Sequence, residues 1–230
     1  MPKKDFIEEL YKKNSQYVFH NEYVKNVKKK SFIKKQLMIQ NLNTNHWIFK
    51  FMKNHKRGNY LEIGPGDCNL LKTFRKFGWT CEGLELQKIY KVKGVHTDIK
   101  KISTKNKNVL VFHDVLEHVV DPVSILRKFS KQQKSGDKLF LAYPNSSSFK
   151  AMILKDKWNM VAPLAHLNFF SVESTKILLK RCGYYPYSIK QTSFVVLKKI
   201  LRNIIRLPIT FLLDILNFRI SSAFKRIPEI

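Results

Sequence analysis

Hydrophobic and polar residues follow two alternating patterns along the middle of the chain. Short apolar runs, typical of buried strands, are separated by segments in which apolar residues recur every three or four positions, as on one face of a helix. The runs occupy residues 59–63, 80–85, 95–97, 109–112 and 185–190. This alternation predicts an α/β fold with a doubly wound, Rossmann-like sheet. The sheet is expected to have seven strands, or six, because the only candidate for the seventh, Phe218 to Phe224, is a poor one.

The two ends of the chain carry helical patterns outside this alternation. Residues 1–57 contain three short stretches with apolar residues at helical spacing, and we expect an N-terminal helical lid there. Residues 193–230 are expected to form a basic amphipathic helical tail, because the apolar residues from Phe194 to Ile205 share one helical face. The residues between these ends, 58–192, form the predicted core.

The predicted tail has features of a membrane-surface helix. Lys198, Arg202 and Arg206 form a stripe opposite its apolar face. The longest apolar run is about a dozen residues, whereas a membrane-spanning helix needs about twenty. A basic amphipathic helix is typical of segments that lie on an anionic membrane. The alternative, a pair of helices that cover the sheet or form a dimer contact, stays open.

A glycine turn follows the first strand of the predicted core. The strand runs into Glu62, and Gly64, Pro65 and Gly66 come directly after it. Glycines let the backbone approach a ligand closely, and the N-terminus of the next helix can bind a negatively charged group. The dinucleotide fingerprint GxGxxG is absent, because Asn69 stands at the position of its third glycine. The turn therefore predicts a different cofactor.

With a second acidic residue, Glu85, ending the next apolar run, the turn resembles motifs one and two of class I S-adenosylmethionine-dependent methyltransferases. The resemblance implies that S-adenosylmethionine is the cofactor. Backbone N–H groups of the turn would bind its methionine carboxylate, Glu62 its ammonium group and Glu85 both ribose hydroxyls. Asp98, just after the third run, would face the adenine amino group. The alternative for Asp98 is a turn residue that caps the local backbone.

The segment after the strand at residues 109–112 strengthens the resemblance. The sequence HDVLEHVVDP, residues 113–122, closely resembles motif four of the ubiquinone-biosynthesis-type O-methyltransferases. His113 stands where that group places a residue over the cofactor. Asp121 and Pro122 are typical of the N-cap and the first position of a helix.

The resemblance continues downstream in the same order. Residues 134–145 are similar to the group's fifth strand with its flanking turns, and Trp158 and the sequence HLNFFS from His166 to Ser171 follow. The resemblance covers residues 59–190. Two features depart from the group's pattern: Cys68 replaces a glycine often found in the loop, and no arginine precedes the first strand. The second departure weakens the narrower quinone assignment.

Two histidines are the candidate catalytic residues. Methyl transfer to a hydroxyl is helped by a base, and neutral imidazole suits this role at physiological pH. His118 is the first candidate and His166 the second, while a purely structural role for either stays open. Asp114, Glu117 and His118 would share one face of a helix and could hold a divalent metal. We predict no metal site, because one helical turn supplies few ligands.

The composition adds a strong positive charge. The net charge is +26 and the isoelectric point about 10.0, with lysines scattered along the chain. A solvated cationic surface and a polyanion-binding surface are both compatible with this charge. The predicted function is O-methylation of a small or lipid-linked acceptor, such as a cell-envelope glycan or a prenylated quinone precursor, at an anionic membrane surface. One alternative is a nucleic-acid methyltransferase. Such enzymes commonly carry an Asn/Asp-Pro-Pro-aromatic motif after the fourth strand, where this chain has residues 113–116, HDVL. The other alternative is a catalytically silent membrane scaffold.

The expected location is the cytoplasm, with peripheral association on the inner face of the membrane. The three cysteines, Cys68, Cys81 and Cys182, form no CxxC pair, which is typical of a reducing compartment. Residues 1–13 are charged and contain no apolar segment typical of a signal peptide. The oligomeric state is not predicted.

Overall fold

The predicted α/β fold is confirmed by the computed structural model, which describes residues 42–86, 92–162, 165–193 and 218–226. The strands are β1 (Asn59–Ile63), β2 (Thr80–Leu84), β3 (Val95–His96), β4 (Val109–His113), β5 (Lys138–Pro144), β6 (Tyr184–Ser193) and β7 (Phe218–Arg226). The α-helices are α4 (Trp47–Met52), α5 (Asn69–Lys76), α6 (Pro122–Ser130), α7 (Phe149–Leu154) and α8 (Val172–Arg181). Three short 3₁₀ helices are η1 (Ile99–Lys101), η2 (Leu116–His118) and η3 (Lys155–Lys157).

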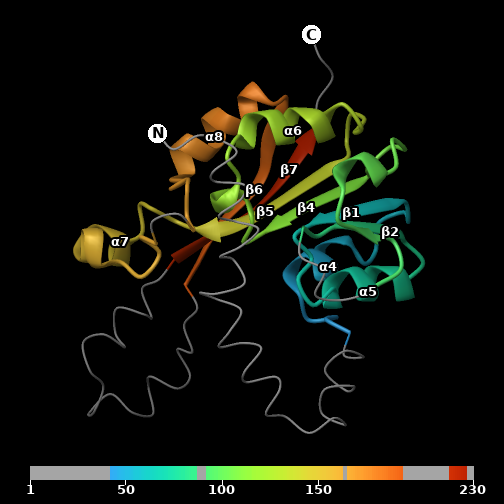
Figure 1. The fold of residues 1–230 in the computed structure, drawn as a ribbon, viewed down its shortest axis with the longest axis horizontal. Helices are drawn as coiled ribbons and strands as arrows, with labels where there is room; N and C mark the ends of the chain where they lie inside the picture. Colours follow the sequence, from blue (N-terminus) through green and yellow to red (C-terminus); the bar gives the residue numbers. More distant parts are fainter. Residues whose placement is uncertain (1–41, 87–91, 163–164, 194–217, 227–230) are drawn as a thin grey trace, which may run out of the picture.

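The described strands form one sheet in the order β3-β2-β1-β4-β5-β7-β6 (Figure 1). The first five strands in this order are parallel, and β7 lies antiparallel between β5 and β6. The chain direction across the sheet reverses between β1 and β4, which are neighbours. In doubly wound sheets such a reversal opens a crevice at the carboxyl ends of the strands, where ligands bind.

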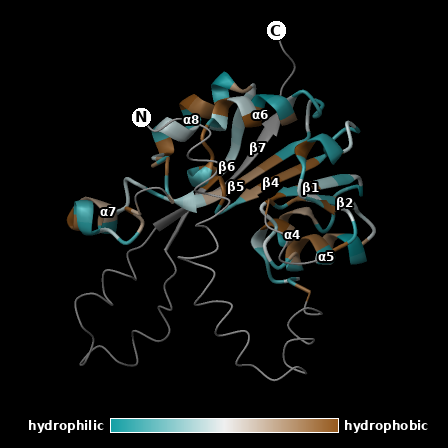
Figure 2. Ribbon diagram, viewed as in Figure 1, coloured by the Kyte–Doolittle hydropathy of each residue, from teal (hydrophilic) through white to brown (hydrophobic). Residues whose placement is uncertain are grey.

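Two layers of helices cover the sheet because alternate residues of each strand point to opposite faces. Leu110 and Phe112 of β4 pack in a cluster with α6 and α8, whereas Val109 and Val111 pack in a cluster with α4 and α5. Figure 1 shows these helix pairs on opposite faces, and in Figure 2 the central strands are the most hydrophobic part of the ribbon.

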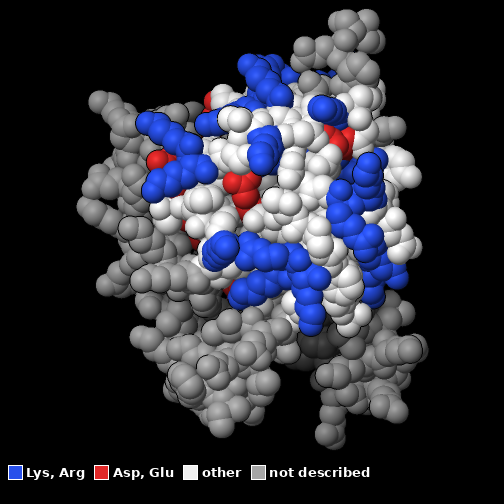
Figure 3. All heavy atoms as spheres, turned by 90° about the vertical axis from the view of Figure 1, so that its right-hand side faces the viewer, with Lys and Arg blue, Asp and Glu red and all other residues white. Residues whose placement is uncertain are grey.

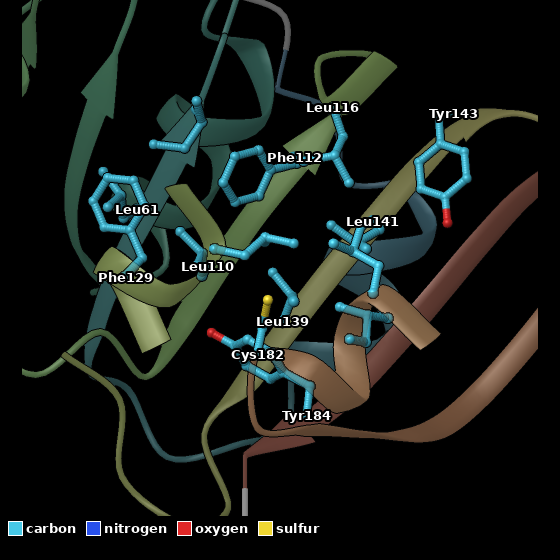
Figure 4. Packing of buried hydrophobic residues seen from close by; sticks show 14 of the residues in the cluster. Leu61, Leu110, Phe112, Leu116, Phe129, Leu139, Leu141, Tyr143, Cys182 and Tyr184 are labelled. Carbon is cyan, nitrogen blue, oxygen red and sulfur yellow. The ribbon is translucent and has the colours of Figure 1, made fainter. Parts of the chain in front are cut away.

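The cluster beneath α6 and α8 is the larger of the two described clusters. Figure 4 shows Phe112 and Leu116 near the end of β4, Phe129 on α6, and Cys182 and Tyr184 beyond α8 directed into the same apolar layer. Burying large side chains of this kind stabilises a fold by about 1.5–3 kcal/mol each. The packing fixes the position of the loops at the strand ends.

Local signals at the helix starts act as predicted. Asp121 caps α6 by accepting a hydrogen bond from the Ser124 N–H at 2.9 Å, and Pro122 is the first helical residue. Ser171 caps α8 with a reciprocal pair of hydrogen bonds to Ser174. These short-range contacts depend only on neighbouring residues.

The predicted end segments are only partly within the described residues. The lid helices before residue 42 and the helix expected at 194–205 lie outside them. Phe218–Arg226, which fell within the predicted helical tail, is the strand β7 instead, and it contains the candidate seventh strand. A helix there would leave β5 and β6 without the partner that they share. Among the described helices, none is long and apolar enough to cross a membrane.

Candidate functional site

The turn after β1 takes a left-handed backbone conformation at three positions. The φ angles are +65° at Gly64, +50° at Gly66 and +60° at Cys68. The Gly64 N–H donates to the Leu84 carbonyl at 2.8 Å, which joins the start of the turn to the end of β2. Glycine adopts this conformation without steric cost, whereas cysteine adopts it with strain. Cys68, which replaces a glycine often found in the related loop, therefore keeps the left-handed conformation that a glycine would take there.

The two glycines of the turn face different surroundings. A Cβ atom on Gly64 would lie 2.4 Å from Cγ2 of Val115, in the segment after β4, whereas a Cβ atom on Gly66 would meet nothing within 4 Å. Gly64 therefore packs the turn against the end of β4. Gly66 presents bare backbone to open space, which fits a ligand that contacts the main chain.

Glu62 lies beneath the turn and is 5% exposed. Its Oε2 accepts a hydrogen bond from the Tyr60 hydroxyl at 2.8 Å, and the Leu71 N–H of α5 also donates to it. Burial, opposed by the hydrogen bonds from Tyr60 and Leu71 and assisted by the carboxylates of Asp67 and Glu85, raises the pKa of this carboxyl to about 8. A bound cation would stabilise the ionised form of Glu62, which burial disfavours.

Glu85 follows β2 and reaches the turn directly. Its Oε2 accepts the Gly66 N–H at 3.2 Å. Asp98 follows β3, and its side chain accepts the Lys100 N–H at 2.9 Å, so that it caps η1. The capping role that the sequence left open for Asp98 is present in the structure, and a role toward adenine stays a prediction.

His113 ends β4, beside β1 in the sheet. Its ring meets the His46 ring edge to face at a centroid distance of 5.2 Å. Burial, with a smaller effect of His113, lowers the pKa of His46 to about 4, so that His46 is neutral. Sequence reasoning missed His46, whose only local signal is its place just before α4, where its Nδ1 accepts the Ile48 N–H.

His118 and His166 lie together although they are far apart in the sequence. Their ring centroids are 4.7 Å apart. Nδ1 of His118 lies 2.6 Å from the carbonyl oxygen of Ala165, and Nδ1 of His166 lies 2.6 Å from that of Met160. A carbonyl only accepts, so each Nδ1 donates its proton to the carbonyl oxygen. Burial lowers the pKa of His118, which favours its neutral form.

The predicted helical face of Asp114, Glu117 and His118 does not form. Asp114 takes a left-handed conformation with φ +55°, and Leu116–His118 is a short 3₁₀ helix. Instead, one ligand atom each from Glu117, His118 and His166 lies within 4.8 Å of the other two. The sequence pointed to both histidines and grouped Glu117 with His118, but it gave no sign that His166 would lie beside them.

Comparisons with known proteins agree with this geometry. A family model described as a methyltransferase domain matches residues 36–189. A comparison with curated proteins finds no match.

Solved structures share the fold. A SAM-dependent methyltransferase from Archaeoglobus fulgidus matches with a TM-score of 0.58 and 17% identity, covering 91% of this chain and 100% of that one. Magnesium protoporphyrin IX methyltransferase from Synechocystis, solved with bound S-adenosylhomocysteine (SAH), has a TM-score of 0.56 and 11% identity, covering 98% and 100%. A SAM-dependent methyltransferase from Methanosarcina mazei has a TM-score of 0.56 and 12% identity, covering 80% and 99%.

Proposed function

Because the chain belongs to the methyltransferase-domain family, as a class I enzyme that uses S-adenosylmethionine, we propose that it methylates an oxygen atom of a small or lipid-linked acceptor at a membrane surface. The acceptor classes that fit are a cell-envelope glycan and a prenylated quinone precursor. The observation that carries the proposal is the pair of adjacent imidazoles, His118 and His166, of which His118 follows closely after Val115, the residue that packs against Gly64.

The turn and the acidic residues around it fit the cofactor. Gly66 offers bare backbone, and its contact with Glu85 places a carboxylate beside the loop. S-adenosylmethionine supplies an electrophilic methyl group on a sulfonium. In the proposed roles the methionine part is bound by Glu62, Gly64, Pro65 and Gly66, the ribose by Glu85, the adenine by Asp98, and His113 lies over the cofactor.

His118 is the proposed base. Its Nδ1 is held by the Ala165 carbonyl, so Nε2 would take the proton of the acceptor hydroxyl as the oxygen bonds to the methyl group. His166, whose Nδ1 donates in the same way to the Met160 carbonyl, is the second candidate. Aligning the acceptor with the methyl group contributes strongly to the rate of such a displacement.

Charge and exposed apolar residues support a membrane surface. Lys and Arg side chains gather in several groups over the face shown in Figure 3, with few acidic side chains among them. Helix α7 projects from one end of the sheet (Figure 1) and exposes Phe149, Met152 and Ile153 at i, i+3 and i+4. Exposed Lys155 and Lys157 follow them. An apolar helix face beside basic residues is typical of interfacial binding.

The activity is tested with methyl-tritiated S-adenosylmethionine and three acceptor pools: a lipid extract, a glycan fraction and total RNA. We expect label in the lipid or glycan pool. The Glu85→Ala variant should bind SAH about 30-fold more weakly, because it loses charged hydrogen bonds worth about 2 kcal/mol, and should label these pools correspondingly less. Label in RNA alone would favour the nucleic-acid alternative, and unlabelled pools with no SAH binding by the intact chain would favour the scaffold.

Membrane association through the tail has its own test. Truncation near residue 191 would also remove β7 from the sheet, so charge reversal is cleaner. Reversing Lys198, Arg202 and Arg206 to glutamate should weaken binding to vesicles with anionic lipid by roughly 100-fold or more, as each basic residue near the surface contributes about 1 kcal/mol.

The matched control for this experiment reverses the same number of charges at exposed positions in α6, at its C-cap and in α8, namely Lys128, Lys131 and Lys180. Its vesicle binding should change little. Equal losses in both triple variants would assign the binding to overall charge rather than to the tail.

A further inference from the structure

The turn after β1 has few backbone hydrogen-bond donors left for a ligand. Four N–H groups of residues 64–69 already donate within the protein: Gly64 to the Leu84 carbonyl, Gly66 to Glu85, Cys68 to the Pro65 carbonyl and Asn69 to the Asp67 carboxylate. Pro65 has no N–H, so among the described residues only the Asp67 N–H of this turn is without such a partner. A carboxylate offers about four lone-pair sites, and leaving them unpaired on binding is costly. A ligand carboxylate at this turn therefore needs a donor from outside it.

His46 lies beside the turn. In the parallel pair of β1 and β4, Phe112 stands opposite Ile63, the residue before Gly64. His113 therefore leaves the sheet at the level where the turn begins. The His46 ring contacts the His113 ring edge to face at a centroid distance of 5.2 Å. His46 is thus one ring away from the residue that adjoins the turn.

A second set of contacts ties the segment before α4 to the helix after the turn. The Asn43 N–H donates to Oγ1 of Thr73 in α5 at 2.6 Å, and this hydroxyl donates to the Asn69 carbonyl at 2.7 Å. The His46 N–H in turn donates to the Asn43 carbonyl at 3.1 Å. His46 is therefore held near both the end of β4 and the first turn of α5.

The half-buried His46 ring uses one nitrogen within the protein. Its Nδ1 accepts the Ile48 N–H at 3.3 Å, which caps α4. Burial, with a smaller effect of His113, lowers the pKa of His46 to about 4, so near pH 7 the ring is neutral and its proton is on Nε2. The hydrogen bonds of the described residues give this Nε2–H no acceptor. A fixed, uncharged donor is therefore present beside the turn.

We propose that the Nε2–H of His46 donates a hydrogen bond to the carboxylate of the methionine part of bound S-adenosylmethionine. The inference rests on the proposed function, which assigns the methionine part to this turn. The carboxylate is the matching group, because it accepts without donating, whereas the ammonium group only donates and is assigned to Glu62. His46 is thus a further cofactor-binding residue, and it acts as a neutral donor rather than as a positive charge.

The test compares two ligands that differ only in this carboxylate, S-adenosylmethionine and decarboxylated S-adenosylmethionine. Calorimetry measures both with the intact chain and with His46→Ser, in which serine still provides a good N-cap for α4. We expect the variant to bind S-adenosylmethionine about 20-fold more weakly, as for a lost hydrogen bond to a charged group. It should bind the decarboxylated form as tightly as the intact chain does.

Two further variants serve as controls. His46→Phe keeps a ring against His113 but removes both nitrogens, so it should show the same selective loss as His46→Ser. His55→Ser makes the same substitution just after α4, where the exposed His55 ring stacks on Phe51 at 5.5 Å. This last variant should leave both affinities unchanged. Thermal melts of all three variants show whether the fold is retained.

Equal losses for the two ligands would make His46 a structural residue and overturn the contact, as would unchanged binding of S-adenosylmethionine by both His46 variants. An intact chain that binds the two ligands equally overturns it even if no variant folds. An intact chain that binds neither ligand loses the proposed function as well. Methyl transfer by His46→Ser with unchanged affinity for S-adenosylmethionine keeps the proposed function and removes only the contact.

Discussion

Alanine at Gly64 destabilises the fold, whereas alanine at Gly66 leaves the fold nearly intact and weakens cofactor binding. At Gly64 the new Cβ atom would lie 2.4 Å from Cγ2 of Val115, and φ is +65°. Valine is stiff at χ1, so the overlap cannot be relieved by a simple rotation. Overpacking and left-handed strain together lower the free energy of unfolding by about 2–4 kcal/mol.

The effect at Gly66 is of a different kind. Its φ of +50° costs alanine about 1 kcal/mol, but nothing in the protein lies within 4 Å of the added carbon. The methyl group would instead occupy the space that we assign to the cofactor. We expect SAH affinity to fall by about 100-fold, equivalent to about 2–3 kcal/mol of overpacking in the complex.

Urea unfolding and SAH titration of both variants measure these effects. The double variant Gly64→Ala/Val115→Ala is the control for the steric part, and it should be more stable than the sum of the two single effects predicts. Loss of stability at Gly66 equal to that at Gly64, with unchanged SAH affinity, would contradict the assignment of the cofactor to this face of the turn.

Glutamine at Glu62 is expected to stabilise the protein at alkaline pH and to weaken binding of S-adenosylmethionine. Burial raises the pKa of the carboxyl from about 4.5 to about 8. Above pH 4.5 the unfolded chain releases this proton while the folded chain keeps it. Stability therefore falls as pH rises through this window and levels off above about pH 8, with a total change on the order of 5 kcal/mol. Glutamine has no proton to release and removes this loss.

The same carboxylate is the proposed partner of the cofactor's positive charge. Affinity of the intact chain for S-adenosylmethionine should rise with pH up to about 8, because the ionised form of Glu62 binds a cation better. In Glu62→Gln this rise should be absent and the affinity at pH 8 about 50-fold lower, as for a lost charged hydrogen bond of about 2–3 kcal/mol.

Thermal melts from pH 5 to 9 and calorimetry at the same pH values compare the intact chain with Glu62→Gln. Tyr60→Phe is a useful control, because it keeps Glu62 and removes only the hydroxyl that donates to it. This variant should melt at a lower temperature than the intact chain. Melting curves of Glu62→Gln that shift with pH in parallel with those of the intact chain would show that Glu62 is ionised throughout this range.

Features that depend on neighbouring residues were predictable from the sequence. The glycine turn after β1, the acidic residue at the end of β2 and the Asp121-Pro122 helix start lie where the patterns indicate. Each is fixed by contacts over a few residues: φ angles that glycine tolerates, a side chain that caps a nearby N–H, and an apolar run that fills a buried strand. This local information determined the α/β fold and its cofactor turn.

The tertiary structure decided the features that join distant segments. β7 pairs with β5 and β6 although it is distant from both in the sequence, and no local pattern distinguishes such a strand from a short apolar helix segment. His118 meets the carbonyl of Ala165, 47 residues away, only because the segment before α8 is tied back to η2. The sequence by itself determined the fold and the turn, and it singled out the two candidate histidines. Only tertiary packing decided that Glu117, His118 and His166 share one site, because that depends on contacts between segments that are not neighbours in the chain.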